Sequence, residues 1–393
     1  MHGVMGAGHG HSDIEVPRSV SRVLLLVIVP LVALTVVGMI LLWPSGDELP
    51  TLEVGEYVEG TVQTIEPCDN GDPACGLATV TVDEGPDEGD TIEVLVTVGG
   101  SSLQLEPGTS VYLVPLPEGS DPAYGLADVN RQVPLLVLTA LFAIAVVALA
   151  RWKGVAALFG LVVSMGILAV FVLPALLEGS SPVAVAAVGA GAIAIVSMGL
   201  AHGVNARTGV ALIGTLIALL LTTVLGQLFT QAMAFTGVAT EDAAYLYAVS
   251  GGVLDLQGLL LAGLVIGALG VLDDVTVTQS ATVWEIYGAD QRAKFSDLWS
   301  AGMRVGRDHV AAVVNTLVLA YVGASLPLFI LISISDAPLL QSLNNEAIAS
   351  EIVRSMVGVL GIIAAVPITT AFAAALLIRS RQRKLETDRH LHS

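Results

Sequence analysis

Residues 258–279 read GLLLAGLVIGALGVLDDVTVTQ, with fifteen apolar or glycine residues in succession before Asp273 and Asp274. An α-helix rises about 1.5 Å per residue, so about 20 such residues cross the roughly 30 Å hydrocarbon core of a bilayer. Leu254 and Leu256 extend the run towards the N-terminus. We therefore expect a membrane-spanning helix over residues 254–274.

The same pattern recurs along the chain, with polar breaks between the runs. The seven further runs cover residues 23–43, 133–150, 155–177, 182–202, 208–233, 310–332 and 354–379. The composition agrees, because 54% of the residues are hydrophobic and 13% are charged, where a soluble protein has about a quarter charged. We expect a mainly α, polytopic helical bundle of about eight spans, with the lipid bilayer as its surroundings. The run 23–43 exceeds a signal-peptide core and lacks a cleavage site, which predicts an uncleaved anchor.

Residues 50–130 differ from the rest of the chain. Short alternating or β-branched runs occur there between turns rich in Gly, Pro and Asp, which is typical of strands. The clearest runs are Thr61–Ile65, Ala78–Val82, Thr91–Val98 and Ser110–Val114. Five or so strands in this length predict a small all-β domain, a barrel of the OB type.

This predicted β-domain carries most of the chain's net charge of −19. Residues 45–130 contain eighteen Asp and Glu and no Lys or Arg, so we exclude nucleic acid as a partner. A solvated outer face is the main interpretation, and concentration of cations is the alternative. Cys68 and Cys75 are the only cysteines. Their spacing is not that of a metal or redox pair and no His is near, so we predict a structural disulfide.

The positively charged residues fix the expected topology through the positive-inside rule. With the N-terminus inside, fourteen Lys and Arg fall in inside segments, and only Arg131 and Arg354 fall outside. We therefore expect a cytoplasmic tail at 1–22, an anchor at 23–43, an extracytoplasmic domain at 50–130, a seven-helix membrane domain at 133–379 and a basic cytoplasmic tail at 380–393. Both termini would be cytoplasmic.

A polar stripe follows the apolar part of the 254–274 helix. If the helix continues past Asp274, then Thr278 and Thr282 lie on the same face at four-residue spacing. Carboxylates and hydroxyls can replace water around a cation, so this stripe could line an ion or proton pathway. The alternative is that Asp273 and Asp274 simply end the span at the interface, an interpretation that we favour for Asp273.

A second polar cluster opens the run 310–332. Arg304 and Asp308 are four residues apart and could pair. Asp308 could instead face Asp274, or it could serve only as an interfacial anchor. Asn315 lies deeper in the span, where a buried amide must find partners. On the preceding span, Gly263 and Gly267 form a small-xxx-small pattern that predicts close helix packing.

Three blocks carry a resemblance to a known family. They are GALGVLDDVTVTQ at 267–279, RVGRD at 304–308 and NTLVLAY at 315–321, and they resemble the YibE/F-like family of bacterial multi-pass membrane proteins. The similarity runs from the extracytoplasmic domain to the last span. It implies an N-terminal anchor, an extracytoplasmic domain and a helical bundle in the bacterial cell membrane. The acid before Val-x-Val in the family pattern matches Asp274, so Asp273 is a departure from it. The resemblance implies architecture and no particular activity.

Motifs of soluble enzymes are missing from the sequence, including H-E-x-x-H, G-x-S-x-G, the Walker loop and the Rossmann fingerprint. We therefore predict no enzyme, no metal site and no cofactor. The leading hypothesis is a transporter or permease, with coupling to a proton or cation, in which a small solute or ion passes along Asp274, Thr278, Asp308 and Asn315. The second is a non-enzymatic scaffold whose extracytoplasmic domain binds a protein partner. The third is an intramembrane aspartyl protease that pairs Asp274 with Asp308 or Asp255.

Overall fold

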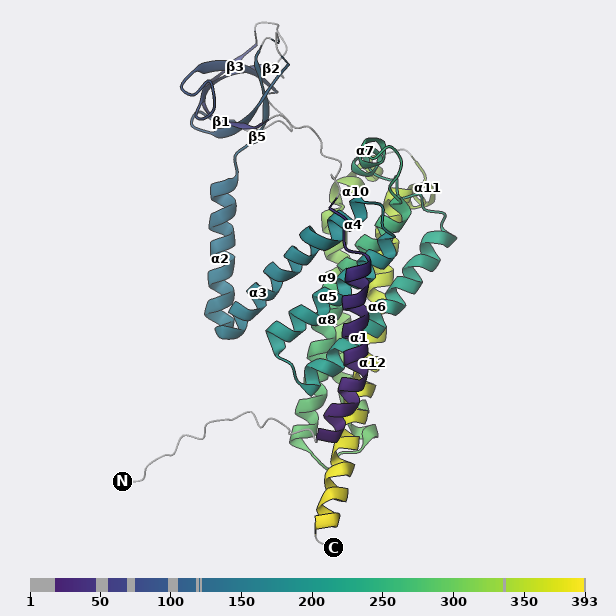
Figure 1. Ribbon diagram of the computed structural model, residues 1–393. Helices are drawn as coiled ribbons and strands as arrows, with labels where there is room; N and C mark the ends of the chain where they lie inside the picture. The colour runs from purple at the N-terminus through teal and green to yellow at the C-terminus, as the bar shows by residue number, and fades with distance from the viewer. Residues whose placement is uncertain are drawn as a thin grey trace, which may run out of the picture. The chain divides into compact units, whose positions relative to one another are not determined.

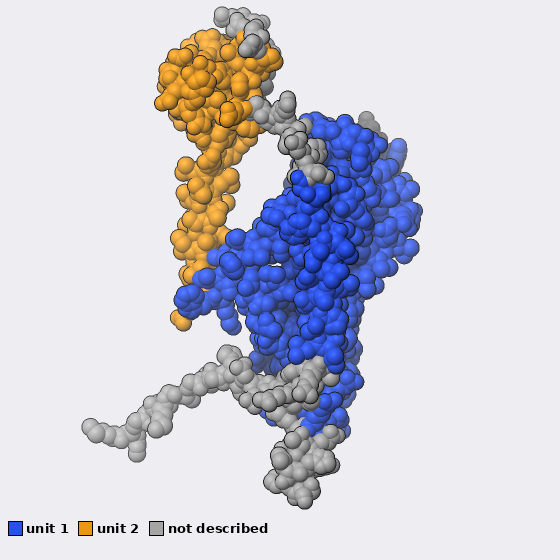
Figure 2. Space-filling model, viewed as in Figure 1, with its two compact units in different colours: residues 1–50, 152–393 blue, residues 51–151 orange. Residues whose placement is uncertain are grey.

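The computed structural model describes residues 18–46, 56–68, 75–97, 105–117, 120, 122–334 and 337–391 (Figure 1). Most of the predicted tail 1–22 and the first residues of the predicted domain 50–130 lie outside the described residues. The chain divides into two compact units, residues 51–151 and residues 1–50 with 152–393 (Figure 2). Each unit is described by itself.

The first part of the 51–151 unit is a curled antiparallel sheet (Figure 1). Its strands are β1 Val58–Pro67, β2 Cys75–Val82, β3 Thr91–Thr97, β4 Ser110–Pro115 and β5 Tyr124–Val129. They are ordered β3-β2-β1-β4-β5, so β1 pairs with both β2 and β4. Alternate residues turn inward and form a small apolar core that includes Val62, Val80, Val94 and Leu113. The predicted all-β character is confirmed over these strands, and the OB type stays a prediction.

The predicted disulfide is present. Cys68 and Cys75 are bonded across the loop end of the β1–β2 hairpin, with their Cα atoms 5.4 Å apart. The Cys68 N–H also donates to the Cys75 carbonyl at 3.2 Å. The covalent bond therefore reinforces a backbone pair at the same position.

The helices follow the predicted runs closely. They are α1 Arg18–Leu41, α2 Gln132–Ala150, α3 Trp152–Ile167, α4 Leu173–Leu177, α5 Pro182–His202, α6 Ala206–Ala232, α7 Glu241–Val249, α8 Leu256–Ala289, α9 Phe295–Ala324, α10 Leu326–Ser333, α11 Leu339–Leu343 and α12 Glu346–Leu391. A π-helical turn, η1 Leu168–Val172, joins α3 to α4. Helix α2 has no buried residue and belongs to the 51–151 unit.

Among the described residues, seven helices are long and apolar enough to cross a membrane. The eighth predicted span, 310–332, is divided between α9 and α10, whose axes differ by 68°. Pro327 lies just after this break, and it cannot continue the α9 helix because proline lacks the N–H that a continuous helix needs. The total is eight only if this bent pair counts as one span.

The ends of the helices are set by local chemistry. The Asn205 side chain accepts from the Thr208 N–H at the start of α6, and Asp255 accepts from the Gly258 N–H at the start of α8. Helix α8 does not stop at residue 274 but runs on to Ala289, because its later turns still bury Val283 and Trp284.

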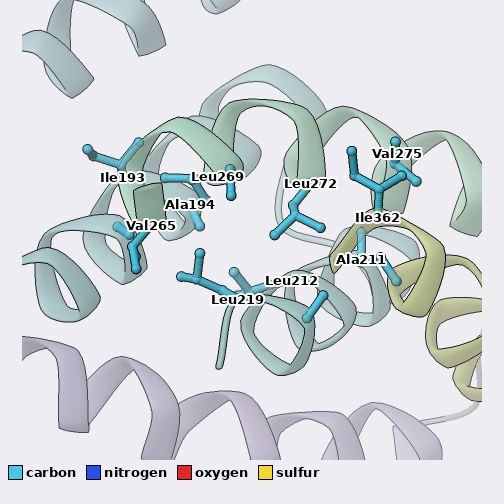
Figure 3. Packing of buried hydrophobic residues seen from close by; sticks show 14 of the residues in the cluster. Ile193, Ala194, Ala211, Leu212, Leu219, Val265, Leu269, Leu272, Val275 and Ile362 are labelled. Carbon is cyan, nitrogen blue, oxygen red and sulfur yellow. The ribbon is translucent and has the colours of Figure 1, made fainter. Parts of the chain in front are cut away.

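The centre of the bundle lies between α6, α8 and α12, with α5 and α9 beside them. Figure 3 shows Leu212 and Leu219 of α6 next to Leu272 and Val275 of α8, with Ile362 of α12 close by. We refer below to two ends of this bundle. At the Glu346 end, α8 and α12 begin, and at the Ala289 end, α8 stops and α9 begins.

The closest packing of α6 against its neighbours involves glycines of α6, and the packing role of Gly263 and Gly267 on α8 stays a prediction. Among the described residues, nothing lies within 4 Å of the position where a Cβ of Gly263 would stand, and a Cβ of Gly267 would meet only the Tyr321 hydroxyl, at 3.3 Å. By contrast, Gly214 and Gly226 of α6 lie directly against side chains of the neighbouring helices. The small residues that bring α8 close to α6 therefore lie on α6.

Candidate functional site

The two adjacent acids of α8 lie in different environments. The Ser197 hydroxyl of α5 donates to Oδ2 of Asp273 at 3.0 Å. The other oxygen, Oδ1, is buried and has no hydrogen-bond partner among the described residues. Asp274 is exposed. Successive residues on a helix point about 100° apart, so only one of the two can face the bundle interior.

Asp273 does not end helix α8, which runs on to Ala289, and the interpretation that it ends a membrane span stays a prediction. Helices α5 and α8 run side by side in the same direction, because Pro182 lies near Gly258 at one level and Ser197 lies near Asp273 at another. Ser197 precedes the last residue of α5, His202, by five residues, or about 7.5 Å along the axis. The carboxylate of Asp273 therefore lies inside the apolar region, nearer to the Ala289 end.

A buried chain of hydroxyls continues from Asp273 towards α6. The Thr276 hydroxyl donates to the Asp273 carbonyl at 3.2 Å and lies 2.6 Å from the hydroxyl of Thr215. Both threonines are fully buried. On the next turn of α8, the Ser280 hydroxyl donates to the Arg207 carbonyl at 2.9 Å. Polar atoms of α8 thus lie along its contact with α5 and α6.

A second polar junction joins α8 to α9 and α12. Gln279 is 1% exposed, and its Nε2 donates to the Gly302 carbonyl at 2.9 Å and to the Thr370 hydroxyl at 2.7 Å. The Thr370 hydroxyl in turn donates to the Val366 carbonyl. The neighbouring Thr369 is also fully buried, and its hydroxyl has no partner among the described residues.

Sequence reasoning did not assign roles to Ser197, Thr215, Gln279 or Thr370. A glutamine inside an apolar helix is a signal that could have found Gln279, because a buried amide must be paired. Serine and threonine carry a weaker signal, since their hydroxyls can bond to the carbonyl of the preceding turn of their own helix.

The residues of the predicted pathway lie on the exposed side of the bundle. The predicted continuation of α8 past Asp274 is confirmed, and Asp274 and Thr278 are both exposed on it. The Thr282 hydroxyl donates to the Thr278 carbonyl at 2.9 Å. Asp308 and Asn315 are exposed on α9. Among the described residues no hydrogen bond joins α8 to α9 through these side chains, and a pathway along them stays a prediction.

The charged groups near this site are few. Arg304 and Asp308 form no ion pair in the described part of α9. Within the described residues no group of three His, Cys, Asp or Glu side chains could hold a metal ion.

Of the two pairs of acids considered for a protease, Asp255 and Asp274 are not brought together. Asp255 caps the start of α8, nineteen residues or about 28 Å along the helix from Asp274. Two carboxyl groups must lie within hydrogen-bonding reach to share a proton. This separation excludes a shared proton between Asp255 and Asp274.

The family model for YibE/F-like proteins matches residues 138–379, which is more than half of the chain and extends from α2 to α12. The chain belongs to the YibE/F-like family. No curated protein and no solved structure matches the chain. Both polar contacts of this YibE/F-like protein lie within the matched region, namely that of Asp273 with Ser197 and that of Gln279 with Thr370. The β-sheet lies before this region. Its apolar helices are consistent with a membrane protein.

Proposed function

We propose that this YibE/F-like protein is a permease that moves a small solute or ion across the bacterial cell membrane, coupled to a proton or cation held at Asp273. The observation that carries the proposal is the buried Oδ1 of Asp273, which has no partner among the described residues, beside an Oδ2 held by Ser197. A carboxylate inside an apolar bundle costs folding energy, and such residues in spans commonly belong to ion or proton pathways.

The chemistry follows from the charge on Asp273. When it is ionised, Oδ1 is a buried acceptor without a donor, which is energetically unfavourable. Uptake of a proton or binding of a cation relieves this cost, and release restores it. The hydroxyl of Ser197, which contacts the carboxylate, is the kind of ligand that can replace water around such an ion.

The proposed orientation comes from the distribution of Lys and Arg. Both termini and the Ala289 end of the bundle would face the cytoplasm, and the β-domain would lie outside, where the Cys68–Cys75 disulfide persists. Asp273 would then be reached most directly from the cytoplasm.

The test uses the full chain reconstituted in proteoliposomes with an imposed proton gradient and a panel of small solutes and ions. We expect gradient-dependent flux of at least one of them, lost in Asp273→Asn and retained in Asp274→Asn. Each variant is first shown to elute as the unmodified protein does in size-exclusion chromatography.

Two results would overturn the assignment. If Asp273→Asn transports normally and Asp274→Asn does not, the pathway follows Asp274, Thr278, Asp308 and Asn315 on the exposed side. If the unmodified chain moves nothing in the panel, the permease proposal fails and the accessory role of the second hypothesis becomes the better account.

A further inference from the structure

A pocket of about 140 Å³ lies where the helix pair α9–α10 bends, between this pair and α12. Most of its wall is apolar and includes Val318, Val322, Phe329 and Met356. Val318, Val322 and Met356 are themselves exposed, so the pocket opens at the surface of the bundle. In a membrane this opening would face hydrocarbon, and an apolar ligand could enter from the lipid phase.

Three of the lining residues, Tyr321, Glu351 and Ser355, carry polar groups, and Glu351 is the charged one. The Arg354 Nη1 donates to Oε1 of Glu351 at 2.9 Å, with 29% and 22% of the two side chains exposed. Arg354 is not itself a lining residue, but its ion pair with Glu351 places it next to the pocket.

Arg354 is only partly satisfied by this pair. A guanidinium has five N–H donors, and the Nε of Arg354 is buried with no partner among the described residues. Arg354 is also the only Lys or Arg between Arg307 and Arg379. It lies eight residues after Glu346, about 12 Å into α12 from that end. A partly paired cation at this depth favours an anion as its additional partner.

We infer that this pocket binds an amphipathic anion, whose hydrocarbon portion fills the apolar wall and whose carboxylate or phosphate pairs with Arg354. Guanidinium groups bind carboxylate and phosphate through two parallel hydrogen bonds, which favours an anionic head over a neutral one. An apolar cavity of roughly 150 Å³ accepts a benzene-sized molecule, so the pocket holds about six carbon atoms of the ligand.

Two sources could supply this chemistry, a free carboxylic acid with a short chain and an anionic phospholipid of the surrounding membrane. Both place a hydrocarbon chain next to a charged head. The inference goes beyond the proposed function and does not depend on Asp273. If the protein binds the anion but transports no solute, the anion-binding proposal is supported and the permease proposal is overturned.

The experiment measures binding of decanoate to the full chain in a neutral detergent by titration calorimetry, with decyltrimethylammonium and decanol as comparisons. We expect decanoate to bind most tightly and to bind about tenfold more weakly to Arg354→Gln. Arg304→Gln, on an exposed turn of α9, is the matched control and should bind as the unmodified protein does.

Two further variants separate binding from folding. Met356 is 62% exposed, so Met356→Trp should fill the pocket without disturbing the core, and decanoate binding should again fall about tenfold. Glu351→Gln removes the competing carboxylate and should strengthen decanoate binding severalfold, an effect that loss of a purely structural ion pair would not produce.

The second arm identifies the source of the ligand. The full chain in nanodiscs of mixed phosphatidylglycerol and phosphatidylcholine should retain phosphatidylglycerol on mild extraction, detected by native mass spectrometry, if a lipid is the ligand. Retention by the unmodified chain and its loss in Arg354→Gln would support the pocket with a lipid source. Decanoate binding alone would support a free acid. Equal or tighter binding of decyltrimethylammonium, or decanoate binding that Arg354→Gln leaves unchanged, would overturn the inference.

Discussion

The Ser197 hydroxyl donates to Oδ2 of Asp273 across 3.0 Å, and this bond joins α5 to α8 inside the apolar part of the bundle. It is the one hydrogen bond that the Asp273 carboxylate accepts in the described part of the chain. The carboxylate therefore depends on a single residue of another helix both for its orientation and for part of its stabilisation.

Replacing Ser197 should weaken the bundle at this contact. Hydrogen bonds between membrane helices contribute about 0.6 kcal/mol on average and up to about 1.7 kcal/mol, and a charged acceptor favours the upper part of this range. We expect Ser197→Ala to lower the unfolding free energy by about 1–2 kcal/mol, measured by denaturation in mixed micelles.

Ser164→Ala is the matched control, because Ser164 is also buried but donates only to the Gly160 carbonyl of its own helix. It should cost less than Ser197→Ala. Equal losses for the two variants would show that the bond to Asp273 contributes no more than an ordinary hydroxyl bond within a helix.

Gln279 should contribute strongly to stability because its side chain joins three helices. Its amide links α8 to both α9 and α12 through Gly302 and Thr370. Gln279→Met keeps the volume but leaves both acceptors without this donor, so we expect a loss of about 1–3 kcal/mol in unfolding free energy. Thr278→Val, one residue away on the exposed side of α8, should change it by less than about 0.5 kcal/mol. If the Gln279→Met and Thr278→Val proteins had the same unfolding free energy, the hydrogen bonds of Gln279 would not contribute to stability.

The long apolar helices could be predicted from sequence because a helix in lipid must satisfy its backbone internally and be apolar over a known length. Because the helix is apolar on all sides, however, its sequence does not show which side of α8 faces the interior. Nearly every residue from 258 to 272 is apolar or glycine, so no polar face distinguishes Asp273 from Asp274. Only packing against Ser197, a partner far away in sequence, decides which acid turns inward.

The run 310–332 shows a different limit. Its hydropathy predicts a single span, yet the chain bends by 68° after Ala324. Pro327 was a local signal of this break, but prolines also occur inside continuous helices of this chain, as Pro30 does in α1. The sequence alone therefore does not say which proline interrupts a helix, since neighbouring helices determine whether the freed carbonyls find partners.

Two glycines in spans should respond differently to the same substitution. A Cβ at Gly214 would overlap the Thr369 side chain, whereas no described residue lies within 4 Å of one at Gly263. We expect Gly214→Ala to lower the unfolding free energy by about 1–3 kcal/mol through overpacking. Gly263→Ala should leave it unchanged or raise it by up to about 1 kcal/mol, because alanine favours helix. Denaturation in mixed micelles compares the two. A larger loss at Gly263 would instead support the predicted small-xxx-small packing with a partner helix.

The disulfide should stabilise the β-domain through the loop that it closes. Cys68 and Cys75 are separated by seven positions, and closing a loop of this size contributes about 2.5 kcal/mol in the chain-entropy account. The double variant Cys68→Ser/Cys75→Ser should therefore be cleaved faster by a protease specific for Glu, of which β1 contains two. Cleavage between residues 56 and 130 is followed by mass spectrometry in the full chain. Unchanged cleavage rates would show that the backbone pairing holds the hairpin alone.

The contact between Glu178 and the segment after α1 should depend on pH. The Ser45 N–H donates to one Glu178 oxygen at 2.8 Å and the Gly46 N–H donates to the other at 3.1 Å. These donors, that of Ser45 first, hold the pKa of the Glu178 carboxyl below its ordinary value of 4.5. A carboxyl with a lowered pKa in the folded state stabilises it above the ordinary value, and this contribution is lost as the pH falls through the lowered value.

We therefore expect the amides of Ser45 and Gly46 to be protected from hydrogen exchange at pH 6–7 and to lose protection below about pH 4.5, after correction for the intrinsic rate. Glu178→Gln should remove most of this pH dependence, because an amide does not titrate and offers one acceptor oxygen where the carboxylate offers two. Glu88→Gln, in the β2–β3 turn, is the control and should leave the protection of both amides as in the unmodified chain. Protection that persists unchanged below pH 4 would mean that packing of Trp43 on Phe171, whose rings stack at 5.9 Å, holds this segment without the carboxylate.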